Sequence, residues 1–186
     1  MNISNIKIKE VIESLATHNS EYALKQLFNI YASPLLRYIF MFVKSKEIAE
    51  ELLSDVFFAI WQQRKELLEI DNFKAYIYKV AKFNALNYLR SKSDIKTLGL
   101  DDIQLDLFTA TQTTPEDKYI SQEVISNINQ AISSLPPKCQ LAFKLIREDH
   151  FSYKEVADHL EISVKTVENH ITTANKKIKE QLLRLK

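Results

Sequence analysis

The chain has 186 residues, of which 46% are hydrophobic and 10% aromatic, enough to form the core of one domain or of two small ones. Its single glycine, Gly99, disfavours tight hairpin turns and excludes a glycine-rich phosphate loop, so we expect an all-α protein. A formal net charge of +1 argues against a uniformly basic nucleic-acid binder, but the charge is unevenly distributed along the chain.

Apolar residues recur at helical spacing after Ser20, which is a predicted N-cap. We expect this first helix to end or kink at Ser33-Pro34, with residues 35–43 continuing beyond it.

The next predicted helix has one broad apolar stripe between residues 49 and 61. Its other face forms a ridge of acidic and polar groups around one aromatic side chain: Glu47, Glu51, Asp55, Phe58 and Gln62. Two interpretations stay open for this ridge. It is either a solvated face with Phe58 beneath a neighbouring helix, or a surface that docks a partner.

Residues 73–90, FKAYIYKVAKFNALNYLR, form a predicted helix that mixes aromatic and basic side chains. The residues predicted to face the core are Phe73, Ile77, Val80, Ala81 and Tyr88. The residues left at the surface or its rim are Lys74, Lys79, Lys82, Phe83, Asn84 and Asn87. This mixture suits unpaired DNA, because lysines follow the backbone while aromatic rings stack on bases. An aromatic stripe at helical spacing is also common in a plain core.

Helical spacing disappears between residues 91 and 117, which are rich in Ser, Thr and Asp. Residues 1–92 carry 13 basic and 10 acidic groups, residues 93–118 carry 2 and 6, and residues 119–186 carry 10 and 8. The sequence therefore predicts two small helical domains, 1–92 and 119–186, joined by a flexible acidic linker at 93–118.

Helical spacing returns at Ile120 and, interrupted by Pro136-Pro137, predicts a four-helix domain whose residues 151–178 form a helix-turn-helix. Ser152 and Glu155 form a capping box at its first helix, and Ser163 is the N-cap of its second. Glu161 occupies the turn, where glycine is usual. A positive φ there would cost about 1 kcal/mol, so we expect a turn of slightly different construction.

The second helix of this hairpin has polar side chains that can contact base edges in a major groove. They are Lys165, Glu168, Asn169, His170, Thr172 and Thr173. The alternative is an ordinary helical hairpin with a solvated polar face.

The sequence offers no candidate catalytic residue, metal site or cofactor site. Cys139 is the only cysteine, which excludes an internal disulfide and favours a core position. His150, His159 and His170 lie 9 and 11 residues apart, which is not a metal-ligand spacing on such a hairpin. No signal peptide and no apolar run of about 18 residues is present, so we expect a cytoplasmic protein without membrane insertion.

In order and spacing, four segments resemble a bacterial RNA polymerase sigma factor of the extracytoplasmic-function (ECF) group of the sigma-70 family, in the short type frequent in Bacteroidetes. The segments are IAEELLSDVFFAIWQQR at 48–64, FKAYIYKVAKFNALNYLR at 73–90, SSLPPKCQLAFKL at 133–145 and SYKEVADHLEISVKTVENHI at 152–171. The resemblance spans residues 21–183 and implies a sigma-2-like domain at 1–92 and a sigma-4-like domain at 119–186.

The resemblance implies core RNA polymerase and promoter DNA as partners, and an anti-sigma factor as an expectation from the family alone. The polymerase-binding residues would be Glu50, Glu51, Asp55, Phe58 and Gln62. The residues at the promoter -10 element would be Lys74, Tyr76, Lys79, Lys82, Phe83, Asn84, Asn87 and Arg90. The residues at the -35 element would be Ser163, Lys165, Thr166, Glu168, Asn169, His170, Thr172, Thr173 and Lys176.

The chain departs from the family pattern in the -10 helix. Tyr76 stands where the family usually has Trp, and Phe83 followed by Asn84 stands where it usually has Asn.

Two other functions stay open at this point. SVKTVENHI also resembles the recognition helix of LuxR-type transcriptional regulators, although the N-terminal half lacks the alternating strands of a receiver domain. The third hypothesis is a helical adaptor protein that binds no DNA.

Overall fold

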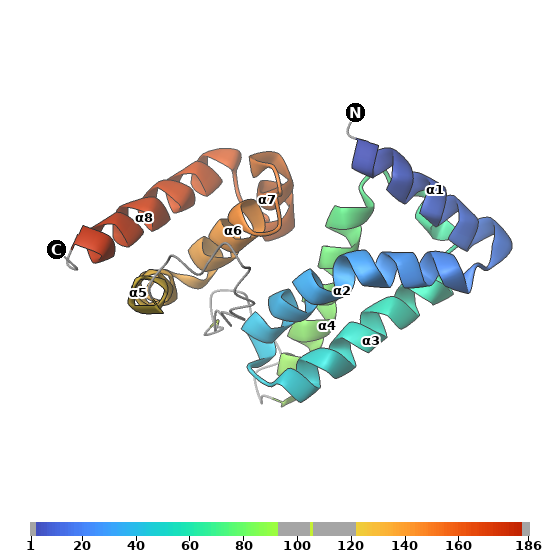
Figure 1. The fold of residues 1–186 in the computed structure, drawn as a ribbon, viewed down its shortest axis with the longest axis horizontal. Helices are drawn as coiled ribbons and strands as arrows, with labels where there is room; N and C mark the ends of the chain where they lie inside the picture. Colours follow the sequence, from blue (N-terminus) through green and yellow to red (C-terminus); the bar gives the residue numbers. More distant parts are fainter. Residues whose placement is uncertain (1–2, 93–104, 106–121, 184–186) are drawn as a thin grey trace. The chain divides into compact units, whose positions relative to one another are not determined.

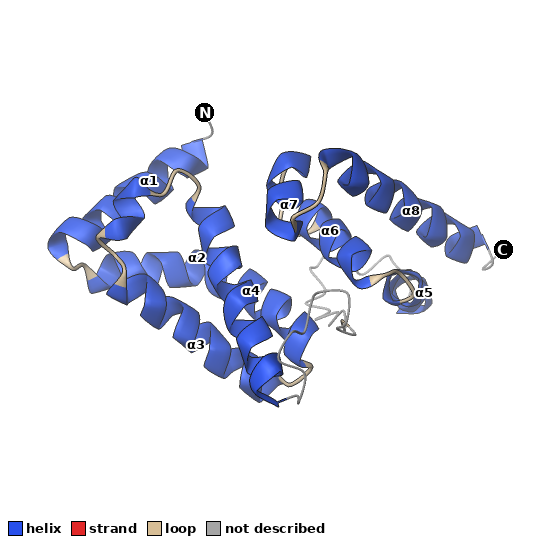
Figure 2. Cartoon of the chain, turned by 180° about the vertical axis from the view of Figure 1, so that it is seen from behind, coloured by secondary structure: helices blue, strands red, loops and turns tan. Residues whose placement is uncertain are grey.

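The computed structural model describes residues 3–92, Leu105 and residues 122–183. These residues form helices and contain no strand, which confirms the prediction of an all-α protein (Figure 2). The chain divides into two compact units, residues 1–96 and residues 97–186. Apart from Leu105, the predicted linker at 93–118 lies outside the described residues.

The N-terminal unit consists of α1 (Ile3–His18), α2 (Glu21–Val43), α3 (Lys46–Gln62), the short 3-10 helix η1 (Glu66–Glu69) and α4 (Phe73–Lys92) (Figure 1). α2 packs against α1, α3 and α4, and α3 also packs against α4. α2 is therefore the central helix of this unit.

The predicted N-cap of α2 is confirmed, because the Ser20 hydroxyl accepts a hydrogen bond from the backbone N–H of Ala23 at 3.2 Å.

The core of the N-terminal unit is apolar and rich in aromatic rings. The predicted stripe on α3 is buried from Ala49 to Ile60, while Trp61 is half-buried. Tyr38 of α2 is fully buried, and its ring centroid lies 5.1 Å from that of Tyr78 on α4. Such tilted ring pairs contribute about 0.5 to 1.5 kcal/mol beyond the area that they bury.

Helix α1 was not predicted from the sequence, because charged and apolar residues alternate over IKIKE. Its inner side is nevertheless helical in spacing, with Ile12 and Leu15 buried. The turn after α1 is tied to the end of α3, since Arg64 Nε donates to Asn19 Oδ1 at 2.6 Å. The same guanidinium stacks on the Trp61 ring, with its carbon 4.8 Å from the ring centroid.

The helix predicted to end or kink at Ser33-Pro34 does not end there: α2 continues through Pro34 to Val43. A proline inside a helix removes one backbone hydrogen bond and costs about 3 kcal/mol. Tyr31, Leu35 and Tyr38 are buried on either side of the proline. Their packing offsets that cost, so the helix persists.

On α4 the predicted core residues Phe73, Ile77 and Ala81 are buried. Val80 and Tyr88 are only half-buried, and Tyr78 and Ala85 are buried in addition. The buried stripe therefore includes the side of α4 that carries Tyr78 and Ala85, and not the side that carries Val80.

The C-terminal unit contains the four predicted helices: α5 (Gln122–Ser133), α6 (Pro137–Arg147), α7 (Tyr153–Leu160) and α8 (Val164–Leu183). α8 packs against α5, α6 and α7. Pro137 is the first residue of α6, where its missing N–H costs nothing. The turn before α6 is closed by Gln140, whose Nε2 donates to the Leu135 carbonyl at 2.7 Å.

Cys139 lies in the core of the C-terminal unit, as predicted, where it packs with Ile132, Leu135 and Ala174. Its S–H donates to the backbone carbonyl of His170 at 3.1 Å. Burial raises the pKa of this thiol, which keeps it protonated and poorly nucleophilic.

One buried ion pair lies at the end of α6. Lys144 and Asp149 have side chains only 2% and 1% exposed, and the Lys144 Nζ lies 3.5 Å from Asp149 Oδ2. The ammonium also donates to Glu148 Oε2 at 2.7 Å, but that side chain is half exposed. This pair holds the chain where it leaves α6 for the helix-turn-helix.

Replacing Asp149 with Ala should lower the unfolding free energy of the C-terminal unit by about 3 kcal/mol, because the buried ammonium loses its buried partner. The double variant Lys144→Met, Asp149→Leu should recover most of that loss. The measurement is urea unfolding followed by circular dichroism, with the fluorescence of Trp61, the only tryptophan, reporting on the N-terminal unit as a control. An Asp149→Ala variant as stable as the wild type would contradict this account.

Candidate nucleic-acid and partner interfaces

Helices α7 and α8 form the predicted helix-turn-helix. Glu155 Oε2 accepts from the Ser152 N–H at 2.7 Å and the Ser152 hydroxyl accepts from the Glu155 N–H at 3.3 Å, so the capping box is confirmed. The predicted second N-cap is also present, since the Ser163 hydroxyl accepts from the Thr166 N–H at 3.0 Å.

The turn between these helices has Glu161 in the left-handed conformation, with φ 57° and ψ 47°. The N–H groups of Glu161 and Ile162 both donate to the carbonyl of Ala157, which closes the end of α7 in the way that a C-terminal glycine does. The expectation of a differently built turn is therefore wrong. Burial of Val156, Leu160 and Val167 offsets the roughly 1 kcal/mol that a non-glycine residue costs there.

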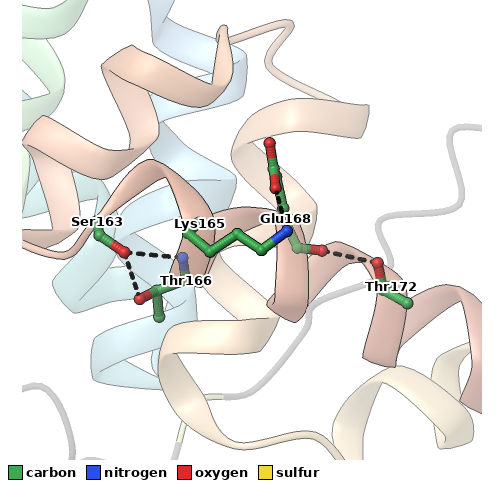
Figure 3. Close-up of polar contacts among 5 residues, drawn as sticks. All are labelled: Ser163, Lys165, Thr166, Glu168 and Thr172. Atoms are coloured by element: carbon green, nitrogen blue, oxygen red, sulfur yellow. Dashed lines mark hydrogen bonds and ion pairs between the residues drawn. The ribbon is translucent and has the colours of Figure 1, made fainter.

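α8 buries one side and exposes the other. Val167, Ile171 and Ala174 are buried. Figure 3 shows two polar contacts along the outer side: Lys165 Nζ donates to Glu168 Oε2 at 2.9 Å, and the Thr172 hydroxyl donates to the Glu168 carbonyl at 2.9 Å. The side chains of Lys165 and Glu168 are 77% and 44% exposed.

Most of the residues predicted for the -35 element share this outer side of α8 at intervals of three and four. They are Lys165, Asn169, Thr172, Thr173 and Lys176. Thr166, Glu168 and His170 are half-buried at its edge, and Ser163 uses its hydroxyl for the cap. The structure thus brings five of the nine predicted residues onto one exposed surface, with the partly exposed Glu168 side chain beside them.

The residues predicted for the -10 element divide into two groups on α4. Five of them lie along the side opposite the buried stripe: Tyr76, Lys79, Phe83, Asn87 and Arg90. Phe83 is 61% exposed, which is unusual for an aromatic residue in a folded chain. Of these five, Lys79, Phe83 and Asn87 are exposed, whereas Tyr76 and Arg90 are half-buried. Lys74, Lys82 and Asn84 lie elsewhere on the helix and are also half-buried.

Tyr76 is held by a hydrogen bond that the sequence did not indicate. Its hydroxyl donates to Oε1 of Gln63, the C-cap residue that follows α3, at 2.5 Å. Partial burial and then the charge of Glu66 raise the pKa of Tyr76, so the hydroxyl stays protonated and able to donate. This contact fixes the ring at the start of the exposed face of α4.

The acidic ridge on α3 is exposed along its whole length. Glu47, Glu51, Asp55 and Gln62 are exposed, and Phe58 is 60% exposed instead of lying beneath a neighbouring helix. The N–H of Glu47 and then the Ser45 hydroxyl, which donates at 2.8 Å, lower the pKa of the Glu47 carboxyl. Glu50 is also exposed but lies to one side, 3.7 Å from Lys46 Nζ.

Val164 is not among the residues predicted for the -35 element, because an apolar residue at a helix start predicts a core contact. It is nevertheless 42% exposed at the first position of α8, beside Lys165.

Within the described ranges 3–92, 105 and 122–183, no group of His, Cys, Asp and Glu side chains is placed to hold a metal ion. No helix in these ranges has the length and apolar character that crossing a membrane requires.

Two family models match the chain, in the order expected from the segments above. The model of sigma-70 region 2 matches residues 27–95, which cover most of the N-terminal unit, and that of sigma-70 region 4 matches residues 125–178. The chain belongs to the sigma-70 family.

Relatives of similar length specify the group. The chain is 24% identical over 159 residues to the RNA polymerase sigma factor SigZ of Bacillus subtilis, which covers 86% of each chain. It is 22% identical over 166 residues to the ECF RNA polymerase sigma factor SigW of Bacillus subtilis, covering 86% of this chain and 89% of SigW. This sigma factor is therefore of the ECF type.

Two solved structures share the fold. One is CnrH in complex with the cytosolic domain of CnrY, with a TM-score of 0.62, 15% identity, and coverage of 94% of this chain and 97% of that one. The other is the sigma factor RpoE in complex with the anti-sigma factor NepR from Bartonella quintana, with a TM-score of 0.60, 17% identity, and coverage of 85% and 95%.

The family defines the function: this sigma factor directs RNA polymerase to promoters. The match to region 2 accounts for the N-terminal unit, which neither a LuxR-type regulator nor a helical adaptor would carry. The sigma-factor hypothesis is therefore favoured over both alternatives.

Replacing Ser163 with Ala should lower the unfolding free energy of the C-terminal unit by about 1 kcal/mol, because α8 loses its N-cap acceptor. Ser163→Asp should retain most of the stability, since a carboxylate also accepts from the first-turn N–H groups. Thr173→Ala, an exposed change within the same helix, is the matched control and should change stability by less than about 0.5 kcal/mol. Urea unfolding measures all three variants, and equal stabilities for Ser163→Ala and the wild type would show that the cap contributes nothing.

Proposed function

We propose that the two units divide the work of promoter recognition. Residues 1–92 act as a sigma-2-like domain that docks on core RNA polymerase and binds the -10 element. Residues 119–186 act as a sigma-4-like domain that binds the -35 element, and residues 93–118 join the two. The observation that carries this proposal is the exposure of one polar face on each of α3, α4 and α8, opposite a buried apolar stripe.

The ridge on α3 is our proposed contact with polymerase. An exposed aromatic residue surrounded by charges of one sign is typical of a protein interface: the ring fills a pocket, and the charges favour a basic partner surface. Phe58 supplies the ring, and Glu51 and Asp55 supply the nearest charges on the same face. Glu50 and Gln62 would lie at the margin of the contact.

The double variant Asp55→Arg, Phe58→Ala should lose at least about tenfold in affinity for core polymerase, because it removes the aromatic anchor and reverses one charge. Glu13→Arg with Tyr22→Ala is the matched control, since it makes the same kinds of change at exposed positions outside the ridge. The measurement is co-elution and titration of each variant with core RNA polymerase. Equal losses in both double variants would show that the ridge has no specific role.

We propose that α4 holds the -10 strand along its exposed face. Moving a base out of the duplex stack costs a few kcal/mol, and stacking on an aromatic ring returns about 1 to 3 kcal/mol. Phe83 is the most exposed ring of α4, and Lys79 and Arg90 lie on the same face to contact phosphates. Lys74, Lys82 and Asn84 would act at the edges of this contact.

We propose that the outer side of α8 enters the major groove at the -35 element. The N-terminal residues of a recognition helix contact base edges, and Lys176, two turns further on, is placed for a phosphate. Binding two separated elements through one linker raises the effective concentration of each domain, so neither domain needs a high affinity alone.

The double variant Lys165→Ala, Asn169→Ala should lower promoter-specific transcription at least about tenfold while core polymerase binding stays unchanged, because two base contacts are lost. Lys25→Ala with Asn29→Ala is the matched control: the residue types and spacing are the same, and both positions are exposed on α2. In vitro transcription with reconstituted holoenzyme provides the measurement. An unchanged transcript yield from the first double variant would exclude α8 as the -35 helix.

We also propose that the protein acts in the cytoplasm, where its polymerase is. It binds promoter DNA and positions the polymerase on it, without catalysing a reaction or holding a cofactor. An anti-sigma factor is a proposed further partner, since both structural neighbours described above were solved as complexes and one of them names an anti-sigma factor. The four segments at 48–64, 73–90, 133–145 and 152–171 support assignment of this sigma factor to the short type frequent in Bacteroidetes.

A further inference from the structure

The outer side of α8 carries a donor and an acceptor at a fixed separation. Lys165 Nζ and Glu168 Oε2 are 2.9 Å apart, on adjacent turns of the helix. Lys165 is the only lysine or arginine between Ser163 and Asn175, and Glu168 is the only acidic residue there. One cation and one carboxylate therefore make up the formal charge of the first three turns, which are the turns that approach base edges in a helix-turn-helix.

A carboxylate in this position needs a partner on the DNA. It faces the strong negative potential of the phosphates, so it weakens binding unless it accepts a hydrogen bond there. In the major groove the donors are the amino groups of cytosine and adenine. The ion pair with Lys165 restrains the Glu168 side chain before DNA arrives, which lowers the entropy that binding would otherwise cost.

The separation of the pair matches one edge of a base pair. In a G·C pair the guanine O6 and the cytosine N4 are joined by a hydrogen bond, so these two atoms lie about 2.9 Å apart in the major groove. The guanine O6 accepts, as a lysine requires, and the cytosine N4 donates, as a carboxylate requires. Lys165 keeps two further N–H groups beyond the one given to Glu168, and one of them can reach guanine N7.

We propose that Lys165 and Glu168 act together as one unit that recognises a single base pair of the -35 element by its keto and amino groups. This inference rests on the proposed role of α8 and adds the chemistry that it selects. The preferred pair is G·C, with guanine facing Lys165 and cytosine facing Glu168.

The same geometry orders the other three pairs. T·A presents a keto oxygen to Lys165 and an amino group to Glu168, but it has a methyl group where guanine has N7, so it ranks second. C·G and A·T place an amino group against the ammonium and a keto oxygen against the carboxylate. They therefore rank last.

The experiment is transcription by reconstituted holoenzyme from a promoter library whose -35 element is randomised, followed by sequencing of the transcribed templates. We expect one position at which the wild type enriches G, and then T, over A and C on the same strand by about tenfold. Glu168→Gln keeps the shape but can donate as well as accept, so it should abolish the keto preference at that position alone. Lys165→Met should abolish it at the same position.

Glu180→Gln is the matched control. It makes the same substitution on the same helix, at an exposed carboxylate 3.9 Å from Lys176 Nζ, and should leave every enriched base unchanged. A second arm uses the selected promoter with 7-deazaguanine at the assigned position. Loss of N7 should reduce transcription to the level of the T·A template.

The outcomes separate the two proposals. Selection of -35 bases that is unaltered by Glu168→Gln and Lys165→Met, or altered by them at two different positions, overturns the paired recognition and leaves the -35 role of α8 standing. A wild type that shows no base selection in the -35 region overturns both.

Discussion

The C-terminal unit depends on one constraint, the burial of a single stripe of α8 beneath three other helices. Val167, Ile171 and Ala174 are buried at helical spacing, and the packing of α5, α6 and α7 covers them. Because the helix is rigid, burying this stripe places Lys165 and Asn169 on the opposite side and Glu168 at the edge of that side. The same rotation of α8 therefore determines both the core of this unit and the exposed polar side of the helix.

Two helices of the N-terminal unit, α3 and α4, also bury an apolar stripe on one side and expose the opposite side. On α3 the stripe that ends at Ile60 is buried, and the ridge around Phe58 lies opposite. On α4 the stripe from Phe73 to Ala85 is buried, and Phe83 is exposed. In both helices an aromatic side chain therefore lies in solvent, on the side opposite the buried stripe.

The near-neutral charge of this sigma factor agrees with its function. A protein that must find promoters only when bound to polymerase gains nothing from a strong attraction to DNA in general. Its 25 lysines and arginines are almost balanced by 24 acidic residues, and on the exposed side of α8 Lys165 is paired with Glu168. Pairing reduces the unspecific attraction to phosphates, while it leaves donors and acceptors that can discriminate between bases.

The local features of the chain could be predicted from the sequence because they depend on neighbours within a few residues. The Ser20, Ser152 and Ser163 caps, the stripe on α3 and the four C-terminal helices belong to this class. So does the all-α fold, since the sequence has helical periodicity and almost no glycine.

Only the tertiary structure decided the features that depend on packing between helices. Pro34 stays within α2, and Glu161 adopts a left-handed conformation. In both cases the burial of neighbouring side chains offsets an unfavourable local conformational free energy, and the local sequence does not show how large that burial is. The hydrogen bond from Tyr76 to Gln63 joins two helices and has no periodic signal. Which of the predicted -10 residues share one exposed face likewise depended on the rotation of α4 about its axis. That rotation is set by the total burial of α2, α3 and α4 together, a quantity that no single segment contains.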